Sequence, residues 1–169
     1  MMLPAAVVMG LAAQCAPNVA PATIAAIVQT ESRGNELAIG VNGLGSKVAQ
    51  PTSVAQAIEV ARFYVAKGYS VDLGLGQINS RNMKALGLTW DTVFEPCTNI
   101  AAAGAVISGN YHSVRAGLHP QRALRIALSM YKGSLHESAL CVRQARTNSE
   151  RHGSVVRRQA DFGMVESCL

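Results

Sequence analysis

Apolar residues recur at helical spacing in several segments of this chain, which predicts a mainly α-helical fold. The clearest segment begins at Pro21, where Ile24, Ile27, Val28 and Glu31 fall at i, i+3, i+4 and i+7. Similar patterns predict helices over residues 4–14, 53–67 and 99–114, and another from residue 120. Hydrophobic residues make up 49% of the chain and aromatic residues only 5%, so the expected core is aliphatic.

The segments between these helices predict a small extended lobe. Residues 36–50 hold three glycines and are expected to be irregular, whereas residues 71–75 alternate as in a short strand. Asn79 is expected to cap a short helix that ends at Gly87, and Ser134 with Glu137 has capping-box spacing. The predicted fold class is mainly α with a small β or extended lobe. A domain over residues 1–146 would precede a basic C-terminal tail, 147–169.

Several classes of protein are excluded by what the sequence lacks. No apolar run reaches the ~18–20 residues that a transmembrane segment requires. No zinc-ligand spacing and no ribbon of aromatic residues is present, so neither a metal site nor a nucleic-acid partner is predicted. No cofactor is implied. The net charge of +5 comes from residues 81–169, with eleven bases against six acids. That excess suits an anionic partner, or it is a solvated basic face.

The four cysteines, Cys15, Cys97, Cys141 and Cys168, are far apart and form no C-x-x-C pair. They allow two disulfides in any of three pairings in an oxidising compartment, or four free thiols in a reducing one. The apolar N-terminal segment has no Lys or Arg before residues 3–11. We therefore interpret it as the first helix rather than as a cleaved leader, and the export route is not evident.

Glu31 is the most informative single residue. A carboxylate that ends an apolar stripe loses hydration, and this raises its pKa and suits a general acid that acts on a glycosidic oxygen. The alternative is a helix-end Glu whose head group reaches water or pairs with Arg33. The segment Gly74-Leu75-Gly76-Gln77-Ile78-Asn79 is the second candidate, because its glycines allow a ligand close to the backbone and its amides can bind a sugar or a peptide. It lacks the third glycine of a dinucleotide-binding loop.

Taken together, Glu31-Ser32, Gly74–Asn79 and Ala127-Leu128-Ser129-Met130-Tyr131 resemble the motifs of the soluble lytic transglycosylase domain, a goose-type-lysozyme-like fold. Within that superfamily the chain is most similar to the specialised transglycosylases of type IV secretion systems, the first component of the VirB series. That closer resemblance is carried by five stretches and covers about residues 3–133: 14–21, 31–32, 38–43, 68–79 and 96–100.

The resemblance implies a peptidoglycan lytic transglycosylase with Glu31 as its single catalytic acid/base. The enzyme would cleave the MurNAc-GlcNAc β-1,4 bond and leave a 1,6-anhydro end, since the substrate's own acetamido group replaces a second carboxylate. It further implies that the glycan is bound by Ser32, Gln77, Asn79 and Tyr131, with Gly74 and Gly76 shaping the groove. A disulfide between Cys15 and Cys97, a periplasmic location, a role in type IV secretion or conjugation and a monomeric state are also expected.

The chain departs from the family pattern after Tyr131, where Lys132-Gly133-Ser134 replaces an Asn-x-Gly sequence. Lys132 would place a cation, suited to an anionic peptide stem, where an amide is usual. Two alternatives stay open. One is true hydrolysis by a muramidase, with Asp72 activating the water. The other is a non-catalytic wall-binding protein that assembles with other secretion components. Cys141 and Cys168 would either staple the tail or remain as free thiols.

Overall fold

The computed structural model describes residues 2–132, whose contacts divide the chain into two compact units. The first unit ends at Ala105 and the second begins at Val106. The elements in chain order are α1 (Ala5–Cys15), α2 (Pro21–Glu31), β1 (Ile39–Val41), α3 (Val54–Ala66), β2 (Val71–Leu73), β3 (Ile78–Asn79), the 3-10 helix η1 (Ser80–Asn82), α4 (Pro96–Val114) and α5 (Pro120–Lys132). The prediction of a mainly α fold with a small extended lobe is confirmed.

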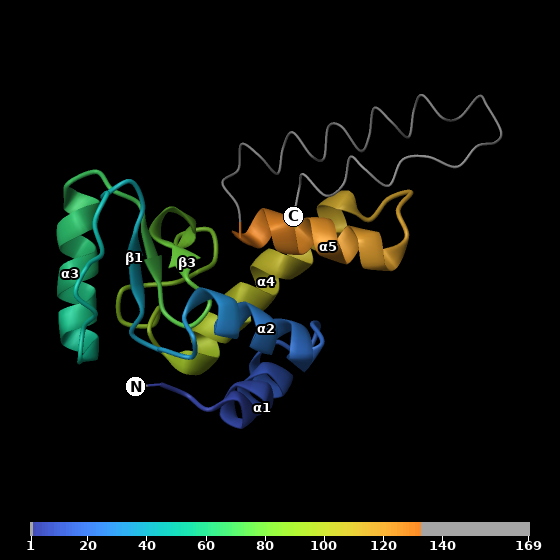
Figure 1. The fold of residues 1–169 in the computed structure, drawn as a ribbon, viewed down its shortest axis with the longest axis horizontal. Helices are drawn as coiled ribbons and strands as arrows, with labels where there is room; N and C mark the ends of the chain where they lie inside the picture. The colour runs from blue at the N-terminus through green and yellow to red at the C-terminus, as the bar shows by residue number, and fades with distance from the viewer. Residues whose placement is uncertain (1, 133–169) are drawn as a thin grey trace. The chain divides into compact units, whose positions relative to one another are not determined.

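Helices α1 and α2 pack against each other in the first unit (Figure 1). Pro21 occupies the first turn of α2, where a missing N–H costs nothing, while Pro4 is the N-cap of α1 rather than its first helical residue. The apolar stripe predicted for α2 is buried at Ile24, Ile27 and Val28. The stripe therefore fixes the rotation of α2 about its axis.

The extended lobe is a three-stranded antiparallel sheet in the order β1-β2-β3. Gly40 of β1, Asp72 of β2 and Asn79 of β3 stand in one cross-strand row. The prediction that residues 36–50 are wholly irregular is wrong at β1. The reason is that this strand is only three residues long and depends on distant partners. On the edge of β1 that faces away from β2, the side chain of Gln50 donates to the carbonyl of Ile39 at 2.9 Å and accepts from the amide of Ile39 at 3.0 Å. These two hydrogen bonds take the place of those that a fourth strand would make.

Helix α3 contacts β1 and β2 and lies along the sheet in Figure 1. Ser53 caps this helix, because its hydroxyl accepts from the amide of Gln56 at 3.2 Å. The side-chain oxygen of Gln56 accepts from the backbone amide of Thr52, one residue before the cap, at 2.8 Å. The helix predicted from Asn79 to Gly87 is shorter than expected. Only η1 is helical there, and the remaining residues form turns.

The second unit contains the C-terminal part of α4 and all of α5. Helix α4 begins at Pro96, three residues before the predicted start, because Pro96 again occupies a first helical turn. Within this unit the side-chain amide of Asn110 donates to the carbonyl of Ala127 at 3.3 Å and joins the two helices. The predicted cap at Ser134 and Glu137, Cys141, Cys168 and the basic tail lie outside the described residues.

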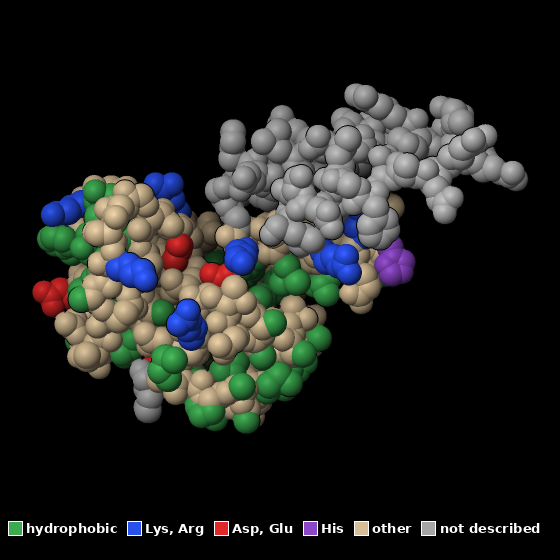
Figure 2. Space-filling view, in the orientation of Figure 1, with side chains coloured by type: hydrophobic (Ala, Val, Ile, Leu, Met, Phe, Trp, Pro, Cys, Tyr) green, Lys and Arg blue, Asp and Glu red, His purple; other side chains and the backbone are tan. Residues whose placement is uncertain are grey.

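Helix α1 presents apolar side chains to solvent. Val7 and Met9 are 46% and 40% exposed, whereas Val8 and Ala12 are buried. Figure 2 shows green side chains gathered over this helix.

Within residues 2–132, none of the helices combines the length and the apolar character needed to span a bilayer.

Candidate functional site

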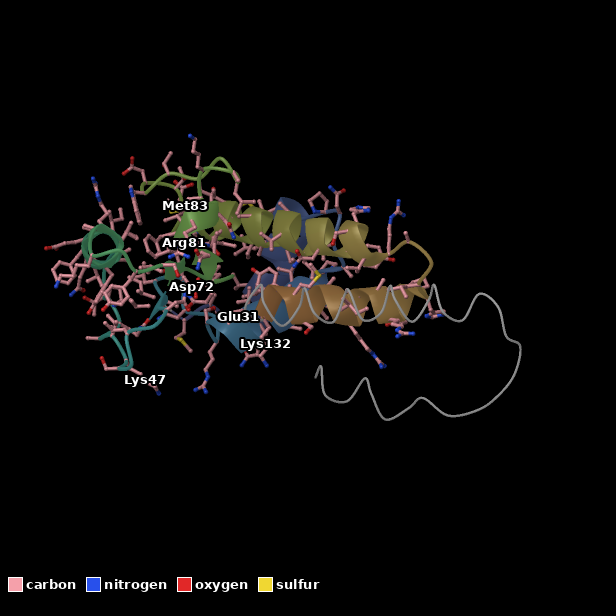
Figure 3. The ribbon with its side chains drawn as sticks, turned by 90° about the horizontal axis from the view of Figure 1, so that it is seen from above. Glu31, Lys47, Asp72, Arg81, Met83 and Lys132 are labelled. Atoms are coloured by element: carbon pink, nitrogen blue, oxygen red, sulfur yellow. A yellow bond between two sulfur atoms is a disulfide. The ribbon has the colours of Figure 1, made fainter. Side chains whose placement is uncertain are left out.

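Glu31 is the last residue of α2, and its side chain is half-buried. The turn of helix that precedes it is anchored by Ile27 and Val28, which are 4% and 1% exposed. Figure 3 shows Glu31 at the end of this helix, with Asp72 on the small sheet. The sequence pattern thus placed the carboxylate correctly, at the point where the apolar stripe of α2 ends.

Ser32 immobilises the end of that helix. Its backbone N–H donates to the carbonyl of Val28 at 3.0 Å, and its hydroxyl donates to the same carbonyl at 3.1 Å. The hydroxyl oxygen also accepts from the amide of Gly34 at 3.2 Å. The carbonyl of Gly34 in turn accepts from the amide of Leu3 at 2.8 Å. The buried hydroxyl of Ser32 therefore donates one hydrogen bond and accepts another. Ser32 acts on Glu31 indirectly, because it holds the backbone that carries the Glu31 side chain.

The predicted Gly74–Asn79 segment is organised around Asn99, which is 1% exposed. The amide oxygen of Asn99 accepts from the backbone of Gly76 at 2.7 Å, and its nitrogen donates to the carbonyls of Leu73 at 3.0 Å and Val93 at 2.7 Å. Gly74 has a φ of +72°, and a Cβ there would overlap the amide of Asn99. Both the conformation and the space therefore require glycine at this position.

Gln77 is held above Gly40 of β1. Its φ of 48° is uncommon for a residue other than glycine. Its side-chain nitrogen donates to the carbonyls of Ala38 at 3.1 Å and Gly74 at 2.9 Å. A Cβ on Gly40 would lie 3.0 Å from Oε1 of Gln77 and 3.9 Å from Oδ2 of Asp72, so both acceptor oxygens lie close to a residue without a side chain. Oε1 of Gln77 accepts no hydrogen bond from another residue in the described part of the chain.

Asp72 joins residues from all three strands or their ends, and we call Asn42, Ser70, Asp72 and Asn79 the Asp72 cluster. The side-chain amide of Asn79 donates to Oδ1 of Asp72 at 2.7 Å, and that of Asn42 donates to Oδ2 at 2.9 Å. Asn42 also donates to the hydroxyl of Ser70 at 3.2 Å. Burial raises the pKa of Asp72, and the hydrogen bonds from Asn42 and Asn79 oppose that rise.

The remaining predicted site residue, Tyr131, lies on α5 in the second unit and is half-buried. Its neighbour Lys132 ends that helix and is exposed (Figure 3). Glu31 and Tyr131 belong to different units, and the role of Tyr131 in binding the glycan stays a prediction. Among residues 2–132, no three His, Cys, Asp or Glu side chains come together in a way that could hold a metal ion.

A sequence model of the Transglycosylase SLT domain matches residues 9–147. The chain belongs to the SLT transglycosylase family. This finding confirms the resemblance carried by Glu31-Ser32 and Gly74–Asn79, and it agrees with the lysozyme-like fold expected from them.

The similar proteins include the Brucella abortus "Type IV secretion system protein virB1", which is 44% identical over 123 residues. The "Protein virB1" of Agrobacterium fabrum is 41% identical over 120 residues, and that of Rhizobium radiobacter is 40% identical over 121 residues. These alignments cover 71–72% of this chain but 49–51% of the relatives. The chain thus spans about half the length of the curated relatives it matches. No solved structure matches it significantly.

The cysteine pair implied by the SLT resemblance is also present. A disulfide joins Cys15 at the end of α1 to Cys97 in the first turn of α4, with a Cα–Cα distance of 5.4 Å. Both residues lie in the first unit. The bond fixes α4, which carries Asn99 two residues later, to the helix that packs against α2.

The sequence analysis did not assign a role to Asn99 or to Asn42, although both side chains organise the candidate site. The partners of Asn99 are 6 to 26 residues away in the chain, and those of Asn42 are 28 and 30 residues away. One local signal was available. Asn99 is a polar residue directly before Ile100, on the otherwise apolar buried side of its helix, which indicates a buried hydrogen-bonding role.

Proposed function

We propose that this chain is a lytic transglycosylase that cleaves the β-1,4 bond between MurNAc and GlcNAc in peptidoglycan. The observation that carries the proposal is the position of Glu31 in an SLT domain. It ends α2 beside Ser32, and Ser32 fixes the backbone at that point. A general acid needs a fixed position relative to the bond that it protonates.

In the proposed reaction the carboxyl group of Glu31 protonates the glycosidic oxygen, and the bond from C1 of MurNAc to that oxygen breaks. The acetamido group of the substrate stabilises the positive charge that develops at C1. The C6 hydroxyl of the same sugar then attacks C1 and returns its proton to Glu31. The product is a 1,6-anhydro ring, no water is consumed, and no second catalytic carboxylate is needed.

We assign glycan binding to Gln77 and Asn79, supported by Ser32, Gly74 and Gly76, and also to Tyr131 of the second unit. Gln77 suits this role because its side chain donates both of its hydrogen bonds to the described residues through its nitrogen, so its amide oxygen can accept from a sugar hydroxyl. Asp72 is better suited to holding the sheet than to activating water, since each of its oxygens already accepts an amide hydrogen bond. This favours the transglycosylase over a muramidase.

We further infer that the enzyme opens the wall locally for a type IV secretion or conjugation system, acts in the periplasm as a monomer and meets other components of that system there. The support is the similarity to proteins named type IV secretion system protein virB1 and the disulfide, which forms in oxidising compartments.

The proposal is tested by digesting purified peptidoglycan with the wild-type chain and with Glu31→Gln, and weighing the released muropeptides. Wild type should release products lighter than lysozyme products by one water, and the variant should lose this activity by about a thousandfold or more. Ordinary reducing ends would instead identify a muramidase. No release by wild type would favour the non-catalytic wall-binding alternative.

A further inference from the structure

The described part of the second unit, residues 106–132, is basic and contains no acid. Residues 106–132 contain four Arg or Lys residues and two histidines but no Asp or Glu. The four cations, Arg115, Arg122, Arg125 and Lys132, are all exposed. Figure 2 shows blue side chains and a purple histidine over α5. No ion pair joins these cations to another described residue, so their charge is available to a partner.

Three of these cations share one side of α5, which we call the basic face: Arg122, Arg125 and Lys132. Their spacing of three and seven residues repeats the period of the helix, and they span about 15 Å along its axis. The two fully buried residues of α5, Ala123 and Ala127, lie on the side of the helix opposite to this face. An interfacial membrane helix must instead present its apolar side to the lipid. The basic face therefore fits a hydrated anionic polymer better than a bilayer.

An open cavity of about 490 Å³ lies where α4 ends and α5 begins. It is lined by Tyr111, His112, Arg115, Ala116, Leu118 and Pro120. The guanidinium of Arg115 can hold a carboxylate through two parallel hydrogen bonds, and the apolar side chains beside it can contact a small aliphatic group. The cavity thus offers a cation next to apolar surface, which matches a carboxylate at the end of a short peptide.

We propose that the basic face and the Arg115 cavity bind the carboxylates of the peptide stems of peptidoglycan. The inference rests on the proposed function, which supplies peptidoglycan as the substrate. Peptide stems carry free carboxylates at intervals along a glycan strand. Helix α5 offers them a row of cations and contains no acid that would compete for those cations. Binding at this surface would hold the strand through its stems, independently of the sugar contacts.

The test is cosedimentation of the full chain, carrying Glu31→Gln to prevent turnover, with purified sacculi. Three of the four cations, Arg115 of the cavity and Arg122 and Arg125 of the basic face, are neutralised together by Arg115→Gln, Arg122→Gln and Arg125→Gln. The matched control is Lys47→Gln, Arg62→Gln and Lys84→Gln, three exposed cations of the first unit whose loss lowers the net charge equally. Chitin, a neutral and stem-free β-1,4 glycan, and vesicles containing phosphatidylglycerol are the comparison ligands.

The first triple variant should bind intact sacculi about tenfold more weakly, while the control stays within about twofold. Binding to stem-free glycan should be weak and equal for all variants. An equal loss in the control, or a loss seen only with vesicles, would overturn the proposal. The wild-type chain is assayed separately for muropeptide release. Failure there would reject the proposed function, whereas the binding comparison decides this inference by itself.

Discussion

The position of Glu31 depends on bonds made by its neighbours in the chain. Ser32 ties the last turn of α2 to Gly34, and Gly34 accepts from Leu3. These contacts fix the backbone on both sides of the carboxylate. Specific positioning of this kind accounts for much of what a general acid contributes, because the barrier depends on how well the acid is aligned with the leaving oxygen.

Asp72 gives the folded protein a predicted dependence on pH. Burial raises its pKa above the ordinary value of 3.8. At pH values between 3.8 and the raised pKa, the folded chain binds more protons than the unfolded chain. The contribution of Asp72 to the free energy of unfolding therefore falls as pH rises through this window. Above the raised pKa the contribution is constant. Asp72→Asn removes this contribution. We expect the stability of wild type relative to this variant to be lower at pH 7 than at pH 4.

Urea denaturation of both proteins at the two pH values measures this change. Asp91→Asn, at an exposed carboxylate in a turn of the same unit, is the matched control. A relative stability that increases towards pH 7 would mean that the hydrogen bonds from Asn42 and Asn79 outweigh the burial of Asp72, contrary to this account.

Asn99 makes three buried hydrogen bonds, and we expect it to contribute more to stability than the other polar side chains of the site. Asn99→Ala leaves the amide of Gly76 and the carbonyls of Leu73 and Val93 without these hydrogen bonds in a buried place. We expect the free energy of unfolding to fall by about 3 kcal/mol. Asn110→Ala removes one partly buried hydrogen bond and should cost about 1 kcal/mol. Equal losses in chemical denaturation would refute the role given to Asn99.

At the scale of elements, the helices that carry the site are held by one covalent link. The disulfide joins α1 to the first turn of α4 across 82 residues of sequence. That loop contains α2, the whole sheet and the segment around Gly74. Cross-linking the ends of a loop this long restricts the unfolded chain strongly.

Reduction of this bond should lower the free energy of unfolding by about 4 kcal/mol. Denaturation with and without dithiothreitol measures the effect. The variant Cys15→Ala/Cys97→Ala retains the other two cysteines and should be insensitive to the reductant. If dithiothreitol destabilises that variant as much as wild type, the stabilising bond lies elsewhere in the chain.

The elements differ in how far the sequence could predict them. Helix α2 was predictable because its stripe and its opening proline are local signals, and the cap of α3 was predictable for the same reason. Strand β1 was missed because three residues with a central Gly40 carry no alternating pattern, and because its hydrogen-bond partners, β2 and Gln50, lie elsewhere in the sequence. The motif around Gly74 was located from its residues, but Asn99, on which it depends, required the fold.

At the scale of the whole molecule, the two units carry different chemistry. The first unit holds Glu31, the Asp72 cluster and the disulfide, and its described residues supply the acidic and amide groups of the site. The described part of the second unit has no acid and presents the basic face. In the proposed function the first unit contacts the neutral glycan backbone, and the basic face contacts the anionic peptides.

The central claim, that Glu31 drives an intramolecular transfer without water, is tested most directly by digestion in water enriched in heavy oxygen. Mass spectrometry of the new MurNAc ends then reports whether solvent oxygen entered the product. The account predicts anhydro ends without heavy oxygen, released by wild type and absent with Glu31→Gln. Reducing ends that carry one heavy oxygen would contradict it, since they require a water molecule activated at the site.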